Sequence, residues 1–213
     1  WFYLASAMIS FKLKSLNKPL EYSMKKEIRV WDPLVRVFHW TLVLSFAIAW
    51  VSANEFDTLH FWAGYTITAL VLFRIVWGVI GTRHARFTDF VYRLSTIKSY
   101  LIDLAALRPK HYVGHNPAGG LMVIILLLSL GLLTFTGMAS VAIDGIGPLA
   151  GTWVESISGH WMEDVHKAVA NLVLAFVLFH IAGVLVSSLV HGENLVRAMI
   201  NGKKEIEEKS DEN

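Results

Sequence analysis

Two histidines, His166 and His180, lie fourteen residues apart in a nearly uninterrupted apolar stretch. Fourteen residues of α-helix make about four turns less 40°, so both imidazoles face the same way, about 21 Å apart along the helix axis. That rise is most of the roughly 30 Å hydrocarbon thickness of a membrane. Because imidazole nitrogens bind iron and other metals, one helix could hold two metal centres, one near each side of a bilayer.

Each of these histidines has a candidate partner at the start of another apolar stretch, His60 or His39. By their expected depth in the membrane, His60 pairs with His166 near the outer side and His39 pairs with His180 near the inner side. Since His39 sits nearer the membrane edge than His180, the last helix has to tilt or extend inward. Each pair could supply both axial imidazoles to one haem b, so we expect an outer and an inner haem, both bound without covalent bonds.

Other roles for these histidines are less favoured. A single membrane histidine can simply be a hydrogen-bonded residue that joins helices. Four histidines that pair by depth favour metal binding instead, because ionisable groups are costly in a bilayer and usually functional. Zinc or copper would need a fuller ligand shell, whereas each depth offers only two histidines with no nearby acidic or sulfur cluster.

The composition points to a membrane protein. Of the 213 residues, 54% are hydrophobic and 17% are charged, and the mean hydropathy is +0.50. The sequence contains no cysteine, which excludes disulfides, thiolate zinc sites, iron–sulfur clusters held by this chain and covalent c-type haem. It also contains no nucleotide-binding glycine loop and no nucleic-acid signature.

Hydropathy marks four stretches of nearly membrane-spanning length, at residues 37–53, 59–80, 118–139 and 168–190. We expect each of them to be an α-helix, because lipid cannot form hydrogen bonds with free backbone amides and a helix satisfies them internally. We therefore predict an all-α fold, an integral membrane four-helix bundle. The bundle is expected over residues 30–202, between an N-terminal extension (1–29) and a charged C-terminal tail (203–213).

Lysine and arginine are distributed unevenly among the connections. Most lysines and arginines lie in residues 25–36, in the connection 81–116 and in residues 197–209, whereas the other two connections are mainly acidic. By the positive-inside rule both termini lie in the cytoplasm and residues 144–164 face a periplasm, as in a multi-pass protein of a bacterial inner membrane. Residues 1–23 are predicted to be either an upstream extension before Met24 or an interfacial helix.

Arg74 lies fourteen residues after His60, on about the same helix face and deep toward the inside. A propionate of the inner haem is its expected partner, because a guanidinium binds a carboxylate with two hydrogen bonds, and snorkelling to the inner headgroups is the alternative. Lys167 could play a similar part outside or reach the outer interface. Gly64, one turn from His60, leaves room for a macrocycle or for close helix packing, and Gly137 is equally ambiguous.

Five histidines remain outside the two pairs. His115 and His191, on the inner side, could hydrogen-bond haem propionates or form part of a quinone pocket. His160 is a comparable candidate on the outer side. For these three, a solvated loop histidine is the favoured interpretation, and His84 and His111 are interpreted as ordinary members of a basic cytoplasmic loop.

Several motifs occur together in the order typical of one family. Residues 30–40 read VWDPLVRVFHW, 74–78 read RIVWG with ARF at 85–87, 114–117 read GHNP, and 163–166 read EDVH before FH at 179–180. Over residues 30–202 the chain resembles the bacterial cytochrome b561 family, which is related to the cytochrome b subunits of nickel–iron hydrogenases. The resemblance implies a four-helix di-haem cytochrome b that exchanges electrons with quinone and a redox partner. By position, its haem ligands are His39, His60, His166 and His180.

The leading function hypothesis is electron transfer across the membrane between the quinone pool and a redox partner, with quinol oxidation or quinone reduction as the only bond-making chemistry. The partner is either a periplasmic electron-transfer protein or a dehydrogenase subunit, and the chain could form a homodimer among the membrane lipids. A second hypothesis is a membrane anchor and electron-conduit subunit of a hydrogenase or other dehydrogenase. A distant third is a small transporter with a histidine proton relay, which the lack of intramembrane carboxylates disfavours.

Overall fold

The structure is a computed structural model that describes residues 24–106, 108 and 110–208. The predicted extension or interfacial helix at residues 1–23 lies outside the described residues. The chain divides into two units, residues 29–204 and the two chain ends together, residues 1–28 with 205–213. The larger unit carries all of the candidate site residues.

Four helices of the larger unit are long and apolar enough to cross a membrane. They are α2 (Pro33–Ser52), α3 (Asp57–Ile80), α6 (Pro117–Ala142) and α8 (Trp161–His191). The predicted all-α, four-helix membrane fold is therefore confirmed. The largest difference from the predicted bounds is in α8, which begins at Trp161 and not at residue 168. Hydropathy misses residues 161–167, about two turns, because they contain Glu163 and Asp164, acidic residues that helix N-termini favour.

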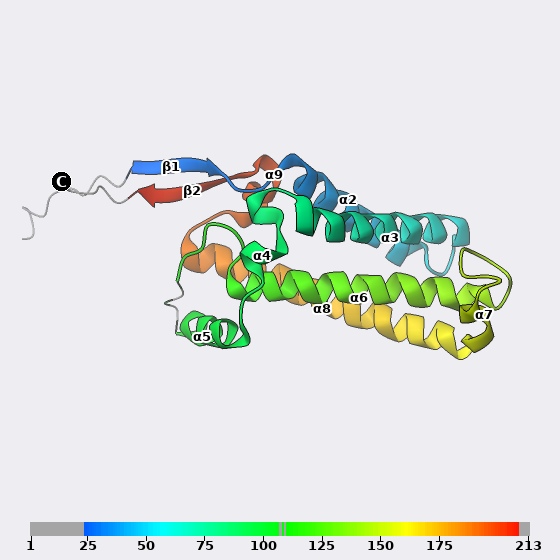
Figure 1. Cartoon of the computed structure of the whole chain (residues 1–213). Coiled ribbons are helices and arrows are strands. Elements are labelled where there is room, and N and C mark those ends of the chain that lie inside the picture. The colour runs from blue at the N-terminus through cyan, green and yellow to red at the C-terminus, as the bar shows by residue number, and fades with distance from the viewer. Residues whose placement is uncertain (1–23, 107, 109, 209–213) are drawn as a thin grey trace, which may run out of the picture. The chain divides into compact units, whose positions relative to one another are not determined.

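The long helices pack as two pairs, α2 with α3 and α6 with α8, and α3 also packs against α6 (Figure 1). The centre of the bundle is a cluster of aliphatic side chains from three of these helices. Its buried members are Ile67, Val71, Leu130, Leu133, Val169 and Val173. Because α8 contacts this core through Val169 and Val173, between His166 and His180, the two histidines are held on one rigid element.

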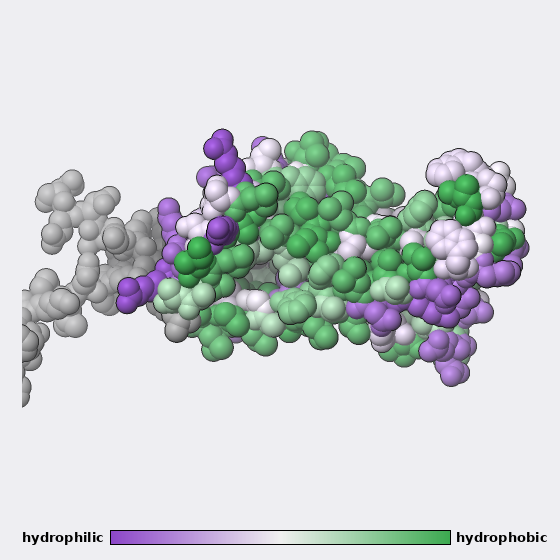
Figure 2. Space-filling view, turned by 90° about the horizontal axis from the view of Figure 1, so that it is seen from below, coloured by the Kyte–Doolittle hydropathy of each residue, from purple (hydrophilic) through white to green (hydrophobic). Residues whose placement is uncertain are grey.

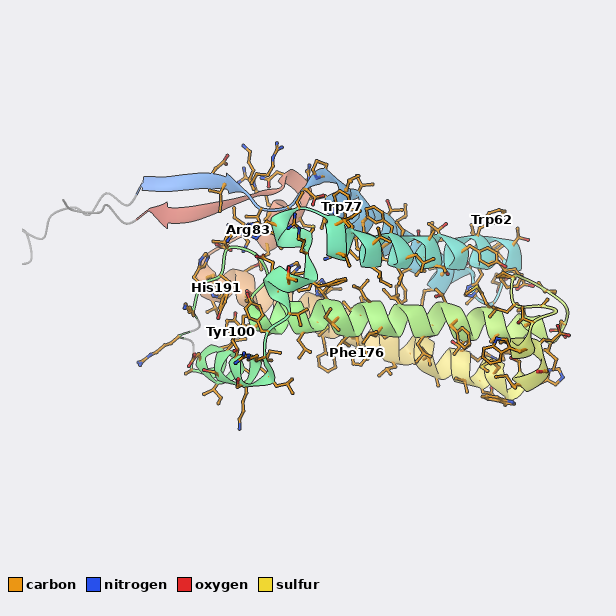
Figure 3. All side chains as sticks on the ribbon, viewed as in Figure 1. Trp62, Trp77, Arg83, Tyr100, Phe176 and His191 are labelled. Carbon is orange, nitrogen blue, oxygen red and sulfur yellow. The ribbon has the colours of Figure 1, made fainter. Side chains whose placement is uncertain are left out.

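The outer faces of these helices are apolar as well. Leu128 of α6 and Leu189 of α8 are 71% and 82% exposed, and many other large apolar side chains are similarly uncovered. Figure 2 shows hydrophobic side chains over the middle of the helices and hydrophilic ones toward their ends. Trp62 and Trp77 lie near opposite ends of α3 (Figure 3), as expected of aromatic residues at the two membrane interfaces.

Two Asx–Pro pairs start spanning helices. Asn116 caps α6, with its Oδ1 accepting a hydrogen bond from the Gly119 amide at 2.7 Å, and Pro117 follows as the first helical residue. Asp32 caps α2 in the same way through the Val35 amide at 2.9 Å. These capping roles account for the DP and NP dipeptides of the sequence motifs.

Asp32 also ties the start of α2 to the end of α3. Its Oδ2 accepts hydrogen bonds from Trp77 Nε1 at 3.2 Å and from the Thr82 hydroxyl at 2.5 Å. Burial alone would raise the pKa of Asp32, but these hydrogen bonds, together with backbone amides at the cap, hold it below its usual value. The carboxylate is therefore ionised at neutral pH and stabilises the helix start.

Shorter elements connect the spanning helices. Between α3 and α6 lie η1 (Arg83–Ala85), α4 (Phe87–Phe90) and α5 (Leu94–Ala105), while α7 (Trp153–Ile157) precedes α8 and α9 (Leu195–Asn201) follows it. Beyond α9, a two-stranded sheet pairs β1 (Met24–Arg29) with β2 (Lys203–Glu208). No sequence pattern predicts this sheet, because both strands are short and highly charged.

Gly120, in the first turn of α6, lies directly against α4. A Cβ atom added at Gly120 would lie 2.2 Å from the backbone oxygen of Phe90, which no side-chain rotation can relieve. We expect Gly120→Ala to lower the free energy of unfolding by about 1–3 kcal/mol, the usual cost of overpacking. Gly131→Ala in the same helix is the control, because its Cβ meets nothing within 4 Å. Equal thermal unfolding midpoints for the two variants in detergent would contradict this prediction.

Candidate functional site

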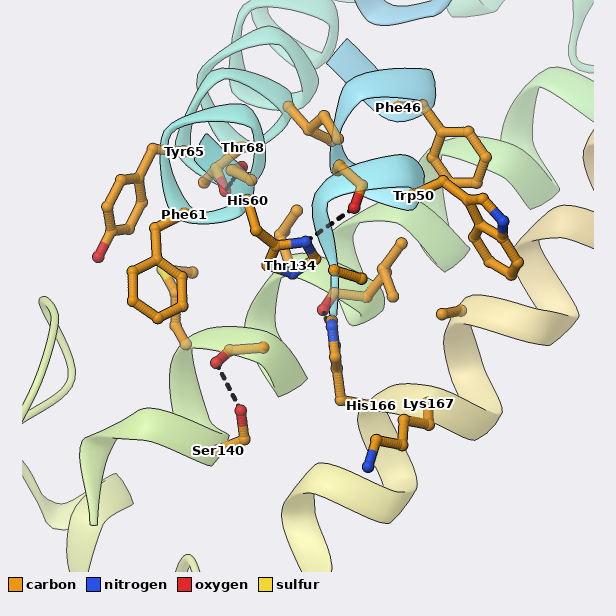
Figure 4. Close-up of a pocket in the computed structure, with 18 of the residues that line it drawn as sticks. Phe46, Trp50, His60, Phe61, Tyr65, Thr68, Thr134, Ser140, His166 and Lys167 are labelled. Atoms are coloured by element: carbon orange, nitrogen blue, oxygen red, sulfur yellow. Dashed lines mark hydrogen bonds between the residues drawn. The ribbon is translucent and has the colours of Figure 1, made fainter. Parts of the chain in front are cut away.

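His60 of α3 and His166 of α8 point into one cavity (Figure 4). Their ring centroids are 6.1 Å apart, and the ring planes are nearly perpendicular at 86°. The cavity has a volume of about 340 Å³. Its lining is largely aromatic and aliphatic, with side chains from all four spanning helices, including Phe46, Trp50, Phe61, Tyr65, Leu133 and Ala170. Such a lining suits a large flat apolar ligand.

Hydrogen bonds determine which nitrogen of each imidazole carries the proton in this pair. His60 Nδ1 lies 2.8 Å from the carbonyl oxygen of Ala49, and His166 Nδ1 lies 3.1 Å from that of Leu133. A carbonyl can only accept, so each Nδ1 is the protonated donor and each Nε2 keeps its lone pair. Both rings are thus held in the tautomer that binds a metal through Nε2.

α6 makes room for the His166 ring. A Cβ atom at Gly137 would lie 2.9 Å from His166 Cε1, so this glycine permits the close approach of the imidazole. The Thr136 hydroxyl lies 3.3 Å from His166 Nδ1 and donates to the Leu133 carbonyl at 2.9 Å. Gly137 was ambiguous in the sequence, and no sequence pattern points to Thr136 or to the two backbone carbonyls.

His39 of α2 and His180 of α8 form the second pair. Their ring centroids are 6.5 Å apart, with an angle of 56° between the planes. His39 also packs edge-on against Trp40 at 5.1 Å. Its Nδ1 is buried and has no hydrogen-bond partner among the described residues, which distinguishes this pair from the other one.

The spacing within both pairs is what a bis-imidazole metal site requires. Metal–nitrogen bonds of about 2.0 Å, with about 1.1 Å from each nitrogen to its ring centroid, place two axial imidazoles about 6.2 Å apart between centroids. The observed separations of 6.1 and 6.5 Å bracket that value. Among residues 24–106, 108 and 110–208, no group of three or more histidine or carboxylate side chains could hold a metal ion. The residues present therefore fit a metal that brings its own equatorial ligands, as haem does.

Arg74 of α3 is deeply buried, with 3% of its surface exposed. Its guanidinium lies over the rings of Phe87 and Phe90, 5.3 and 5.6 Å from their centroids. Snorkelling to the headgroups is therefore wrong, because α4 covers the side chain. Its NH1 nitrogen has no hydrogen-bond partner in the described part of the chain, so Arg74 can donate a hydrogen bond to an anion such as a carboxylate.

His115 is not a solvated loop histidine. Its ring packs against Trp31 and Phe90, at 4.6 Å between centroids in each case, and its Nδ1 is buried with no partner in the described residues. Burial, followed by the positive charge of Arg74, lowers the pKa of His115 to about 3. The ring is therefore neutral at physiological pH.

The remaining predicted site residues lie at the cavity. Lys167 is 63% exposed in its side chain and forms an ion pair with Glu163 at 2.6 Å, one turn earlier in α8. Gly64 lines the cavity, and a Cβ atom there would meet nothing within 4 Å. The space beside Gly64 is therefore open, which favours room for a large ligand over close helix packing at this position.

Three other histidines have specific partners. His84 Nδ1 lies 2.9 Å from Asp89, and His111 Nε2 lies 2.6 Å from Glu193, so neither is simply a member of a solvated loop. His191 belongs to the last turn of α8, where its Nδ1 lies 2.9 Å from the Ser187 carbonyl. His160 is exposed at the start of α8, in agreement with the solvated interpretation.

These features define a class: a multi-pass helical membrane protein in which one long helix contributes a histidine to each of two cross-helix pairs. A family model described as prokaryotic cytochrome b561 matches residues 30–202, and the chain belongs to this family. It is thus a bacterial b-type cytochrome, a haem b protein that transfers electrons in a membrane.

Individual relatives agree with this assignment. A probable Ni/Fe-hydrogenase B-type cytochrome subunit of Azotobacter chroococcum mcd 1 is 26% identical, over 82% of this chain and 87% of its own length. Similar proteins from Rhizobium leguminosarum bv. viciae and Escherichia coli (strain K12) are each 24% identical, covering 88% and 81% of this chain and 92% and 88% of their own lengths. No solved structure matches the chain.

Proposed function

We propose that this protein carries electrons across the bacterial inner membrane between the quinone pool and a redox partner on the periplasmic side. It does so with two haem b groups, each ligated by two histidines. The observation that carries the proposal is the pair of ring separations, 6.1 Å for His60–His166 and 6.5 Å for His39–His180. Both pairs share α8, so the two levels of the bundle are connected by one rigid helix.

The residues divide the work of binding between them. His60 and His166 present Nε2 lone pairs at one level, and their Nδ1 protons are held by backbone carbonyls. His39 and His180 serve the second level, where Arg74 and His115 offer unpaired polar atoms to the propionates. Haem held by these histidines would supply an iron that exchanges one electron, and two histidine ligands at each level would leave no place for oxygen to bind.

Charge supports the orientation. The segment between α3 and α6, which lies at the His39 end of the bundle, contains six basic and two acidic residues. The connection between α6 and α8 contains acidic Asp144 and Glu155 and no basic residue. By the positive-inside rule the His39 end faces the cytoplasm and the His60 end faces the periplasm.

The partner is proposed from the relatives. Because the similar proteins are named as hydrogenase B-type cytochrome subunits, we propose a dehydrogenase of that kind, or a periplasmic electron-transfer protein, as the partner at the acidic end. Lys167 and Glu163 lie at this end on an exposed turn of α8. In this arrangement the chain is both the membrane anchor and the electron conduit of the partner.

Electron transfer across the membrane can be measured in proteoliposomes. Haem-loaded protein is reconstituted with ferricyanide trapped inside, and a membrane-impermeant reductant is added outside. We expect ferricyanide reduction at least ten times faster than in protein-free vesicles, and loss of that rate in His166→Leu. A second arm adds a short-chain quinol and follows haem reduction by absorbance. Haem that is reduced without internal ferricyanide reduction would rule out the relay, and a protein that binds no haem would favour the transporter.

A further inference from the structure

We propose that α5 lies in the interfacial region of the membrane and binds anionic phospholipid headgroups. α5 has twelve residues, Leu94–Ala105, and spans only about 18 Å, too short to cross the hydrocarbon core. It packs against α6, whose first residue is Pro117, so it lies at the level where a spanning helix begins (Figure 1). The proposal is independent of haem binding.

The side chains of α5 fall into three sectors around its axis. Ile97 and Tyr100 form the sector that is buried against the protein, and the Tyr100 ring contacts that of Tyr112, which precedes α6, at 5.8 Å (Figure 3). A second sector is polar, with Ser95, Ser99 and Asp103 on successive turns. A helix packed on a protein in water needs only these two sectors.

The third sector is apolar and has no protein cover. Leu94, Leu101 and Ile102 are 79%, 47% and 60% exposed. At 100° per residue these three side chains fall within an arc of about 100° that lies between the buried sector and the polar one. A helix with this pattern buries its apolar arc in the boundary between headgroups and acyl chains and keeps its polar sector in water.

The positive charges on α5 favour anionic lipid as the ligand of its apolar arc. Lys98 lies inside the apolar arc and is exposed, and Arg93 at the N-cap of α5 is exposed as well. Lysine in an apolar arc extends its ammonium group to the headgroup level while its stem stays in the apolar layer. The single acidic residue of the helix, Asp103, lies in the polar sector on the other side. The membrane-facing surface of α5 is therefore purely basic and apolar.

The absence of cysteine allows a direct test, because one introduced cysteine can be labelled alone. Leu101→Cys in the apolar arc and Ser99→Cys in the polar sector form a matched pair two residues apart. Each is labelled with a small fluorophore and placed in vesicles that contain phosphatidylcholine and phosphatidylglycerol, with one of the two lipids brominated in its acyl chains. Retained haem absorbance verifies that each variant is folded, and Ile102→Cys replaces Leu101→Cys if it is not.

We expect strong quenching by brominated chains at position 101 and little at position 99. Brominated phosphatidylglycerol should quench the label at 101 more than brominated phosphatidylcholine does, and this preference should fall about fivefold for each charge removed in Arg93→Gln and Lys98→Gln. Absence of quenching at both positions would show that α5 lies outside the interface, and equal quenching at both would show that its apolar arc is not turned toward the lipid. Quenching at 101 without lipid preference would overturn the anionic headgroup site.

Discussion

Replacing His60 by alanine is expected to reduce the haem content from two per chain to one. His60 faces His166 at 6.1 Å, and loss of one imidazole leaves a single axial ligand and a cavity in place of the ring. His166→Ala should remove the same haem, whereas His39→Ala and His180→Ala should remove the other one. The measurement is a pyridine haemochrome assay on purified protein, together with reduced-minus-oxidised spectra.

The matched control for these variants is His160→Ala. His160 is exposed, caps the N-terminus of α8 six residues before His166 and has no role in either pair, so both haems should remain. Full haem content after replacement of His180 would show that the second pair is assigned wrongly. Loss of both haems from every variant, accompanied by a large loss of thermal stability, would instead indicate that the bundle folds only when both are bound.

The second large effect is expected on the reduction potentials. Arg74→Gln should lower the more positive of the two midpoint potentials by roughly 40 mV, which corresponds to about 1 kcal/mol for a one-electron couple. Arg74 is 3% exposed and lies at the end of α3 that is close to His39 and His180, so its charge is poorly screened. A nearby cation favours the reduced, less positive iron centre.

The two histidine pairs should differ in potential even without Arg74. In the His60–His166 pair both Nδ1 protons are donated to carbonyls, which makes the imidazoles stronger ligands and stabilises the oxidised metal. His39 has no such acceptor among the described residues. The haem bound by His60 and His166 should therefore have the lower midpoint potential. This order favours electron entry from that side.

A spectroelectrochemical titration tests both statements. Arg83→Gln is the control, because Arg83 follows the same helix but has a side chain that is 84% exposed, so solvent screens its charge and neither potential should move. A shift of the more negative potential in Arg74→Gln would place Arg74 beside the wrong pair. Two haems with the reverse order of potentials would refute the hydrogen-bond argument and leave the proposed function intact.

Much of the fold follows from the sequence alone. A run of twenty apolar residues has one economical conformation in lipid, so hydropathy locates α2, α3, α6 and α8 to within a few residues at most ends. The spacing of His166 and His180 places both on one face of α8 for the same reason, because helix geometry is periodic. The family follows from local motifs such as residues 30–40, whose capping roles the structure explains.

What the sequence could not supply depends on contacts between segments far apart in the chain. The acceptors for His60 and His166 are backbone carbonyls of Ala49 and Leu133, and every residue carries a carbonyl, so only packing decides which ones meet an imidazole. The cover of Arg74 by Phe87 and Phe90, and the burial of His115, arise because α4 folds back over α3 and α6. Local periodicity determined the helices and their histidine faces, whereas tertiary packing decided the tautomers and the burial of the cation, because these depend on neighbours that no local pattern encodes.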